Sequence, residues 1–263
     1  AASDVVYIGD YHTLRQAQKI PIRLLETVLT HPDFAVQHRP VVLGLEMFRA
    51  TDQGKVEAYI EGRLPESDFL AAIDYVGTWG FPWVHYRTLL EFAKKHGVRI
   101  LAANAEVPPG KNRLARRDAA VADVIACAHA ADPKALFVFL FGDLHVAESH
   151  LPSRVDEALA RKGAPPVRRL VVYQNEESIY WQLAEAGHEQ KVDVVKVNER
   201  AYVVMNATPL HKLQSYLNWQ DHHEELHCRM HPNWCEVGED EIDFTGQVTE
   251  LIRSICGFLE LPV

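Results

Sequence analysis

Two short segments of the sequence place a carboxylate and an imidazole directly after an apolar run. Asp10 and His12 stand in the first segment, Gly-Asp-Tyr-His at residues 9–12. Asp143 and His145 stand in the second, Gly-Asp-Leu-His at residues 142–145. Two imidazoles together with several carboxylates are the side chains that hold a divalent metal ion or carry out general acid–base catalysis. The glycine before each acid permits a sharp turn, so both side chains of a segment can approach a shared centre.

Three further polar side chains follow apolar, β-branched runs in the same way. These are Glu46, Asn104 and Gln174. In an open parallel sheet, ligands bind beyond the carboxyl ends of the strands. We therefore expect polar groups from five strand ends to converge on one crevice. Each Gly-Asp-x-His segment alone is equally typical of a turn whose Asp caps the next helix, so the prediction depends on the whole set.

The elements that position these groups alternate along the first two-thirds of the chain. Short β-branched runs alternate with longer patterns of helical periodicity, which predicts an α/β fold with a central, mostly parallel sheet flanked by helices. Strands are predicted at residues 5–8, 41–45, 99–103, 135–141 and 168–173. Shorter strands at 179–183, 192–197 and 201–205 are expected to form an antiparallel edge. Helices are predicted at 14–29, 53–61, 66–75, 86–96, 114–130 and 153–162.

The character of the sequence changes after residue 205. Residues 206–209, Asn-Ala-Thr-Pro, are typical of a helix cap with proline at the first helical position. Helices are predicted at 210–228 and 244–259, and together they form a C-terminal helical appendage. We therefore divide the chain into an α/β domain at residues 1–208 and an appendage at residues 209–263.

The appendage contains a second group of potential metal ligands. His223, His227 and His231 are four residues apart, so on a continuous helix their imidazoles share one face. Cys235 adds a thiolate after a proline. These four residues are candidate metal or haem ligands, and the alternative is a solvated helix that is rich in histidine.

Composition excludes several classes of protein. With 27 Lys and Arg against 36 Asp and Glu, the formal net charge is −9, so a nucleic-acid partner is not expected. Arg113, Arg116 and Arg117 form the one dense basic spot, which we interpret as a solvated helix face. The four cysteines are too few and too scattered for a disulfide scaffold.

The sequence contains no apolar run of the roughly 20 residues that span a bilayer, so no transmembrane segment is expected. Residues 1–7 lack the basic start and apolar stretch of a signal peptide. The compartment stays open: cytoplasmic, or membrane-associated or periplasmic if a leader preceded Ala1.

Five segments in a fixed order resemble the ChaN-like proteins. They are residues 5–12, 43–48, 79–83 with Tyr86, 103–104 and 141–145. These iron-regulated haem-binding proteins of bacteria are grouped with the Tiki, TraB and erythromycin-esterase proteins. The resemblance covers residues 5–208 and implies an α/β fold with a pocket at the strand ends. The family usually has Glu where this chain has Asp10.

The resemblance implies a protein of haem or iron handling, with haem as cofactor and a homodimer as one assembly. One ChaN-like protein is credited with a tyrosine iron ligand. Tyr11, Tyr86 and Tyr216 are candidates for that ligand by residue type, and Asn104 is a further candidate for the cofactor pocket.

The chemistry of the strand-end residues favours an alternative, a metal-dependent hydrolase acting on an ester or peptide bond. In that hypothesis His12, Glu46 and His145 hold a divalent ion, and Asp10 and Asp143 orient the two imidazoles. Glu46 is then the general base. In a metal-free form Glu46 and His12 are the acid–base pair, as the esterase relatives suggest. A third hypothesis is a catalytically silent scaffold whose polar strand ends satisfy one another.

Overall fold

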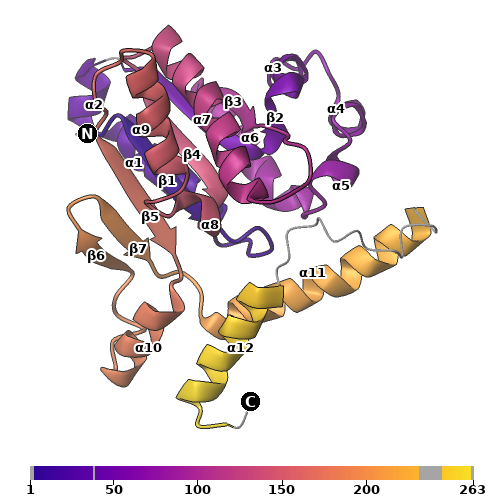
Figure 1. Cartoon of the computed structure of the whole chain (residues 1–263), viewed down its shortest axis with the longest axis vertical. Helices are drawn as coiled ribbons and strands as arrows, with labels where there is room; N and C mark the ends of the chain where they lie inside the picture. Colours follow the sequence, from indigo (N-terminus) through magenta and orange to yellow (C-terminus); the bar gives the residue numbers. More distant parts are fainter. Residues whose placement is uncertain (1–2, 38, 231–244, 262–263) are drawn as a thin grey trace.

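A seven-stranded sheet forms the centre of the computed structural model, which describes residues 3–37, 39–230 and 245–261 (Figure 1). The strand order is β3-β2-β4-β1-β5-β7-β6. All neighbouring pairs are parallel except β6 and β7, which are antiparallel. The strands are β1 (Val5–Asp10), β2 (Val41–Arg49), β3 (Arg99–Asn104), β4 (Leu136–Gly142), β5 (Arg169–Gln174), β6 (Val194–Asn198) and β7 (Ala201–Val204). This arrangement confirms the predicted α/β fold with its mostly parallel sheet.

Helices cover both faces of the sheet, and two apolar clusters lie between the layers. One face packs against α1 (Lys19–Thr30), α3 (Gln53–Ile60), α4 (Glu66–Ala72) and α6 (Trp83–His96). The other face packs against α7 (Arg113–Ala131) and α9 (Leu151–Arg161). The remaining elements are α2 (Pro32–Gln37), the 3-10 turn η1 (Ala50–Asp52), α5 (Tyr75–Thr78), α8 (Asp143–Val146), α10 (Glu177–Glu185), α11 (Pro209–Met230) and α12 (Thr245–Phe258).

Strand β4 shows why the sheet is buried on both sides. Its residues are all buried, and alternate side chains point to opposite faces. Phe137 and Phe139 belong to the cluster under α7 and α9, whereas Val138 and Leu140 belong to the cluster under α1 and α6. A continuous apolar run is typical of a parallel strand in this position.

The structure corrects the prediction at two elements. Residues 179–183, expected as a strand, lie in helix α10. A short apolar run has no periodicity that separates strand from helix, and here Glu177 in the first turn and Gly187 beyond the end favour the helix. The helix expected from residue 14 begins at Lys19, because turns at residues 12–18 precede it. The expected antiparallel edge is present as β6 and β7.

Helix α11 lies across the carboxyl ends of the central strands, with α12 beside it (Figure 1). Its position is set by contacts with the segment after β1 and with the loop before α6. The Ser215 hydroxyl group lies 2.9 Å from that of Thr13, and the Trp219 ring stacks on Phe81. The predicted appendage therefore covers the edge where the polar strand ends gather. Among the described residues, no helix is both long and apolar enough to cross a membrane.

Candidate functional site

Polar groups from three neighbouring strands line one small cavity at the carboxyl edge of the sheet. Asp10 ends β1 and His12 follows it, Glu46 lies in β2, and His145 follows β4. Because β2, β4 and β1 are adjacent in the sheet, their ends meet. The cavity has a volume of about 60 Å³, enough for one or two water molecules. Residues of α11 close it from the side opposite the sheet: Tyr216 and Trp219.

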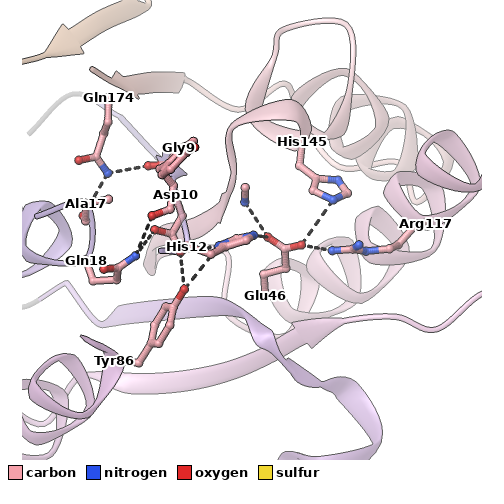
Figure 2. Close-up of polar contacts among 12 residues, drawn as sticks. Gly9, Asp10, His12, Ala17, Gln18, Glu46, Tyr86, Arg117, His145 and Gln174 are labelled. Carbon is pink, nitrogen blue, oxygen red and sulfur yellow. Dashed lines mark hydrogen bonds and ion pairs between the residues drawn. The ribbon is translucent and has the colours of Figure 1, made fainter. Parts of the chain in front are cut away.

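Asp10 holds the imidazole of His12 in a fixed orientation (Figure 2). Its Oδ2 atom lies 2.9 Å from Nδ1 of His12 and accepts a hydrogen bond of 2.8 Å from the Tyr86 hydroxyl group. Its Oδ1 atom accepts a hydrogen bond from the side-chain amide of Gln18. A carboxylate with these donors favours the tautomer of His12 that carries its proton on Nδ1. The Nε2 atom is then a proton acceptor that faces Glu46.

Glu46 is buried and anchored by two donors. The backbone N–H of Gly142 donates to Oε2 at 2.6 Å, and Arg117 forms an ion pair with Oε1. Burial lowers the pKa of the Arg117 guanidinium group to about 10, so this group remains charged at neutral pH. The pairing between β2 and β3 shifts register after Leu45, which is where the chain leaves regular pairing and presents Glu46.

Gly142 allows the close approach of these groups. A Cβ atom at this position would lie 3.1 Å from Nε2 of His12 and 3.5 Å from Oε2 of Glu46. An added Cβ atom would press on the imidazole of His12 and would be in ordinary van der Waals contact with Glu46.

His145 forms a second imidazole–carboxylate pair on the other side of Glu46. Its Nδ1 atom is hydrogen-bonded to Oδ1 of Asp118, and the other oxygen of that carboxylate lies 3.1 Å from Nδ1 of His150. Burial lowers the pKa of His145, which favours the neutral ring. Its Nε2 atom lies 3.4 Å from Oε1 of Glu46, against 3.9 Å between Nε2 of His12 and Oε2 of Glu46. Two oriented imidazoles thus flank one carboxylate.

The acid expected to orient His145 is a different residue. Asp143 lies on α8 and lines the cavity, but Asp118 of α7 holds the imidazole. The Oδ1 atom of Asp143 is buried over Gly9 and has no hydrogen-bond partner among the described residues. Burial accordingly raises the pKa of Asp143 to about 7. Gly9 is required there because a Cβ atom would collide with that oxygen.

The other expected pocket residues occupy different places. Tyr11 lines the cavity, with Nζ of Lys212 located 4.7 Å from the centre of its ring. Tyr86 is buried and its hydroxyl group is bonded to Asp10, so it does not face an open slot. Asn104 ends β3 and does not line the cavity. Gln174 donates to the backbone oxygens of residues 9 and 17, which is a structural role in the turn after β1.

Arg117 and Asp118 are the site residues that the sequence interpretation missed. The arginine cluster was interpreted as a solvated face, and this is wrong for Arg117, which reaches Glu46. The sequence does contain a pattern that could have identified Asp118. Asp118 shares the helical spacing of the buried residues Val121, Ala122 and Ile125. A carboxylate on an apolar helix face needs a partner, and here the partner is His145.

Two groups of residues were predicted as metal ligands, one at the strand ends and one in the appendage. Within the described residues, no group of three or more His, Cys, Asp and Glu side chains is arranged to hold a metal ion. At the strand ends, Arg117 already pairs with Glu46. In the appendage, His223 and His227 lie in α11, while His231 and Cys235 lie outside the residues that the structure describes.

Two larger cavities adjoin the small one. The first, here called the aromatic groove, has a volume of about 740 Å³ and shares Thr13, Phe81 and Trp219 with it. Other residues of its wall are Leu70, Tyr75, Val76, Pro82, Trp83 and His85. The second, here called the polar cavity, has a volume of about 720 Å³ and shares Tyr11, Asp143 and Leu144. Its wall includes Glu176, Glu177, Glu250 and Lys212.

Comparisons with known proteins confirm the resemblance. Residues 1–108 match the family described as haem-binding uptake, Tiki superfamily, ChaN. No curated protein matches the sequence.

The solved structures that this chain matches include ChaN of Campylobacter jejuni, reported with cofacial haem binding. It is 13% identical with a TM-score of 0.45, over 66% of this chain and 82% of that chain. The type III effector HopBA1 is 13% identical with a TM-score of 0.48, over 78% of this chain and 88% of that chain. The toxin effector domain RRSP of Vibrio vulnificus is 21% identical with a TM-score of 0.38, over 55% of this chain and 28% of that chain.

Proposed function

We propose that this chain, whose residues 1–108 match the ChaN group of the Tiki superfamily, is a hydrolase of an ester or amide bond. One observation carries the proposal. A buried glutamate, Glu46, stands between two imidazoles, and a separate aspartate orients each of them. Pairs of this kind, in which a carboxylate fixes the tautomer of a histidine, serve as general bases.

The donors on Glu46 favour His12 as the base. Arg117 and the Gly142 N–H occupy the two carboxylate oxygens of Glu46, so these oxygens are less available to accept a proton from water. Nε2 of His12 takes a proton from a water molecule, and the oxygen of that water adds to the carbonyl carbon of the substrate. Glu46 stabilises the imidazolium ion that forms 3.9 Å away. The same proton then passes to the leaving oxygen or nitrogen as its bond to carbon breaks.

A divalent ion at His12, Glu46 and His145 is the metal-dependent form of this proposal. Asp10 and Asp118 would then support the imidazoles as outer-sphere partners. The ion pair between Arg117 and Glu46 favours the metal-free form, because a guanidinium group already neutralises the carboxylate oxygen that a metal would need.

The test is hydrolysis of 4-nitrophenyl esters and of anilide substrates by the full chain, with metal content measured before and after treatment with a chelator. We expect turnover that survives chelation and falls at least about 100-fold in His12→Ala. His188→Ala, an exposed histidine away from the cavity, is the matched control. Activity that disappears on chelation and returns with one metal would establish the metal-dependent form. Equal turnover in His12→Ala and the control would remove His12 from the mechanism.

The family match favours a second candidate function, haem binding for haem or iron handling. The small cavity is far below the roughly 300–1,000 Å³ of usual ligand pockets, but the aromatic groove lies within that range. Two buried atoms on its lining residues have no hydrogen-bond partner among the described residues: the Tyr75 hydroxyl oxygen and Nδ1 of His85. Tyrosine and histidine are both axial ligands of haem iron, so Tyr75 and His85 are the candidate ligands for haem in this groove.

In this second proposal Tyr75 or His85 would hold the iron, and Phe81, Trp83 and Trp219 would contact the porphyrin faces. A haem titration followed by the Soret band tests it. We expect a saturating endpoint at a simple ratio of haem to chain, and its loss in Tyr75→Phe combined with His85→Ala. Tyr59→Phe, which does not line the groove, is the control. Weak, non-saturating changes in the full chain would reject haem binding.

A further inference from the structure

The aromatic groove and the small cavity at the strand ends have two aromatic wall residues in common. Phe81 and Trp219 stack with their ring centres 5.0 Å apart and line both spaces. The imidazole of His12 packs against two rings of this region, at 4.5 Å from Trp79 and 4.7 Å from Phe81. The groove therefore ends at Phe81, whose ring contacts the imidazole that takes the proton in the proposed reaction.

The wall of the groove has an apolar part and a neutral polar part. The apolar part includes Leu70, Val76, Phe81 and Trp83, and the polar part comes largely from α11, with His211, Gln214, Ser215, Asn218 and His222. Among the described residues that line the groove, none is a carboxylate and Arg15 is the one permanently charged side chain. Val76 on α5 lines it and is 50% exposed, although a valine side chain gains stability from burial. Its volume lies within the range of pockets that bind drug-sized molecules.

The polar cavity on the other side of the site has the opposite character. Glu176, Glu177 and Lys212 line it, and it shares Tyr11 and Asp143 with the small cavity at the strand ends. Hydrolysis leaves an alcohol or amine on one side of the broken bond and an acyl group on the other. The alcohol or amine suits the polar side, whereas an apolar acyl chain suits the aromatic groove.

From this geometry we infer that the aromatic groove binds the acyl chain of the substrate, and that this chain is apolar. This inference rests on the proposed hydrolase function. Phe81 and Trp219 are the specificity-determining residues, because they line both the groove that takes the acyl chain and the cavity that takes the carbonyl group. The substrate class is thus an ester or amide of an apolar acid.

The test is kcat/KM for 4-nitrophenyl acetate, butyrate, hexanoate and octanoate with the full chain. Each buried methylene favours the transition state by about fourfold, so we expect a steep rise from acetate to hexanoate. Val76→Glu places a charge in the groove, and should remove this rise. Val84→Glu is the matched control, since Val84 is 56% exposed but does not line the groove.

A flat dependence on chain length, or the same loss of selectivity in Val76→Glu and Val84→Glu, overturns the inference. If no ester is hydrolysed, the hydrolase proposal fails and the groove is tested by binding alone. The fluorescent probe is then N-phenyl-1-naphthylamine, displaced by decanoate. Displacement that is lost in Val76→Glu and kept in Val84→Glu supports an apolar-acid site. Displacement by haem but not by decanoate overturns it in favour of a porphyrin site.

Discussion

At the scale of single residues, the site is defined by the donors and acceptors around Glu46. Three proton acceptors face one another, namely the Glu46 carboxylate and the Nε2 atoms of His12 and His145. Arg117 and the Gly142 N–H satisfy the carboxylate, while each imidazole has its other nitrogen fixed by an aspartate. Such an arrangement leaves the two Nε2 atoms as the groups that can exchange protons with a bound molecule.

Glu46→Gln tests the charge of that carboxylate. Glutamine keeps the size of the side chain and an oxygen that accepts from Gly142, but it cannot stabilise an imidazolium ion. We expect hydrolysis to fall at least about 100-fold with the fold retained, and the melting temperature to fall because the buried Arg117 loses its counter-charge. Ester turnover and circular dichroism provide the two measurements. Turnover retained at the original rate would show that Glu46 takes no part.

Asp143→Asn tests the buried, unpaired carboxylate through the pH dependence of stability. Burial raises the pKa of Asp143 to about 7 from its usual value near 4. The folded state therefore binds a proton more tightly than the unfolded state, and the contribution of Asp143 to stability is lost as the pH rises through about 7. We expect Asp143→Asn to be more stable than the unmodified chain at pH 8, by on the order of 2 kcal/mol, and to lose most of this advantage at pH 5.

Urea denaturation at both pH values measures the effect. Asp123→Asn, a substitution at an exposed helix position, should show no such dependence on pH. A pH-independent difference for Asp143→Asn would mean that Asp143 is not the titrating group.

At the scale of elements, α7 and β2 decide whether the site forms. Helix α7 presents Asp118 to His145 and Arg117 to Glu46 from consecutive positions. The ring of Phe139 in β4 lies over its register partner Gly44 in β2, so a Cβ atom at Gly44 would collide with that ring. The packing of these two elements therefore sets the distance between Glu46 and the groups that flank it.

Gly44→Ala tests the contact between the ring of Phe139 and the backbone of β2 at Gly44. The added methyl group must displace a buried aromatic ring, so we expect a loss of about 1–3 kcal/mol in the free energy of unfolding. Gly54→Ala in α3 is the control, because its Cβ would contact nothing within 4 Å and alanine favours the helix. Urea denaturation of the two variants should give changes of opposite sign. A neutral Gly44→Ala would show that Phe139 moves aside freely.

Asp118→Asn tests the role of α7 as a positioning element. Asparagine supplies one acceptor where the carboxylate serves both His145 and His150. We expect kcat to fall roughly tenfold to a hundredfold with KM nearly unchanged, because the residue orients an imidazole without contacting the substrate. Asp123→Asn, on the exposed face of the same helix, should leave both constants unchanged. An increase in KM alone would point to substrate binding instead.

At the scale of the whole molecule, α11 completes the site from the far end of the sequence. Ser215 contacts Thr13, and the Trp219 indole donates to the backbone oxygen of Gly80 at 3.2 Å. The division predicted between residues 208 and 209 remains a prediction. The contacts nevertheless make the cavity depend on both parts of the chain.

Trp219→Ala tests that dependence. The substitution removes the stacking on Phe81 and the hydrogen bond to Gly80, so we expect a loss of about 1–3 kcal/mol in stability and a weaker preference for long acyl esters. Leu217→Ala on the same helix is the control, since Leu217 is 43% exposed and its change should stay within about 0.5 kcal/mol. Equal stability of the two variants would mean that α11 does not seal the cavity.

The layered architecture, and the edge of the sheet at which the polar residues gather, can be predicted from the amino-acid sequence alone. Apolar runs and their spacing are local signals of burial, and the ends of parallel strands share one edge of the sheet. Asp10, Glu46 and His145 could therefore be predicted as neighbours from their positions after three strands.

The residues that pair with His145 and Glu46 could be identified only from the folded structure. Asp118 holds His145 in place of the nearer Asp143, and Arg117 reaches Glu46 from a helix that looked solvated. Residues 179–183 joined a helix whose Trp181 stacks on Phe258 of α12. Each of these contacts joins residues far apart in the chain. Local periodicity carries no information about which strands lie side by side or which helix crosses their ends, because long-range packing fixes both.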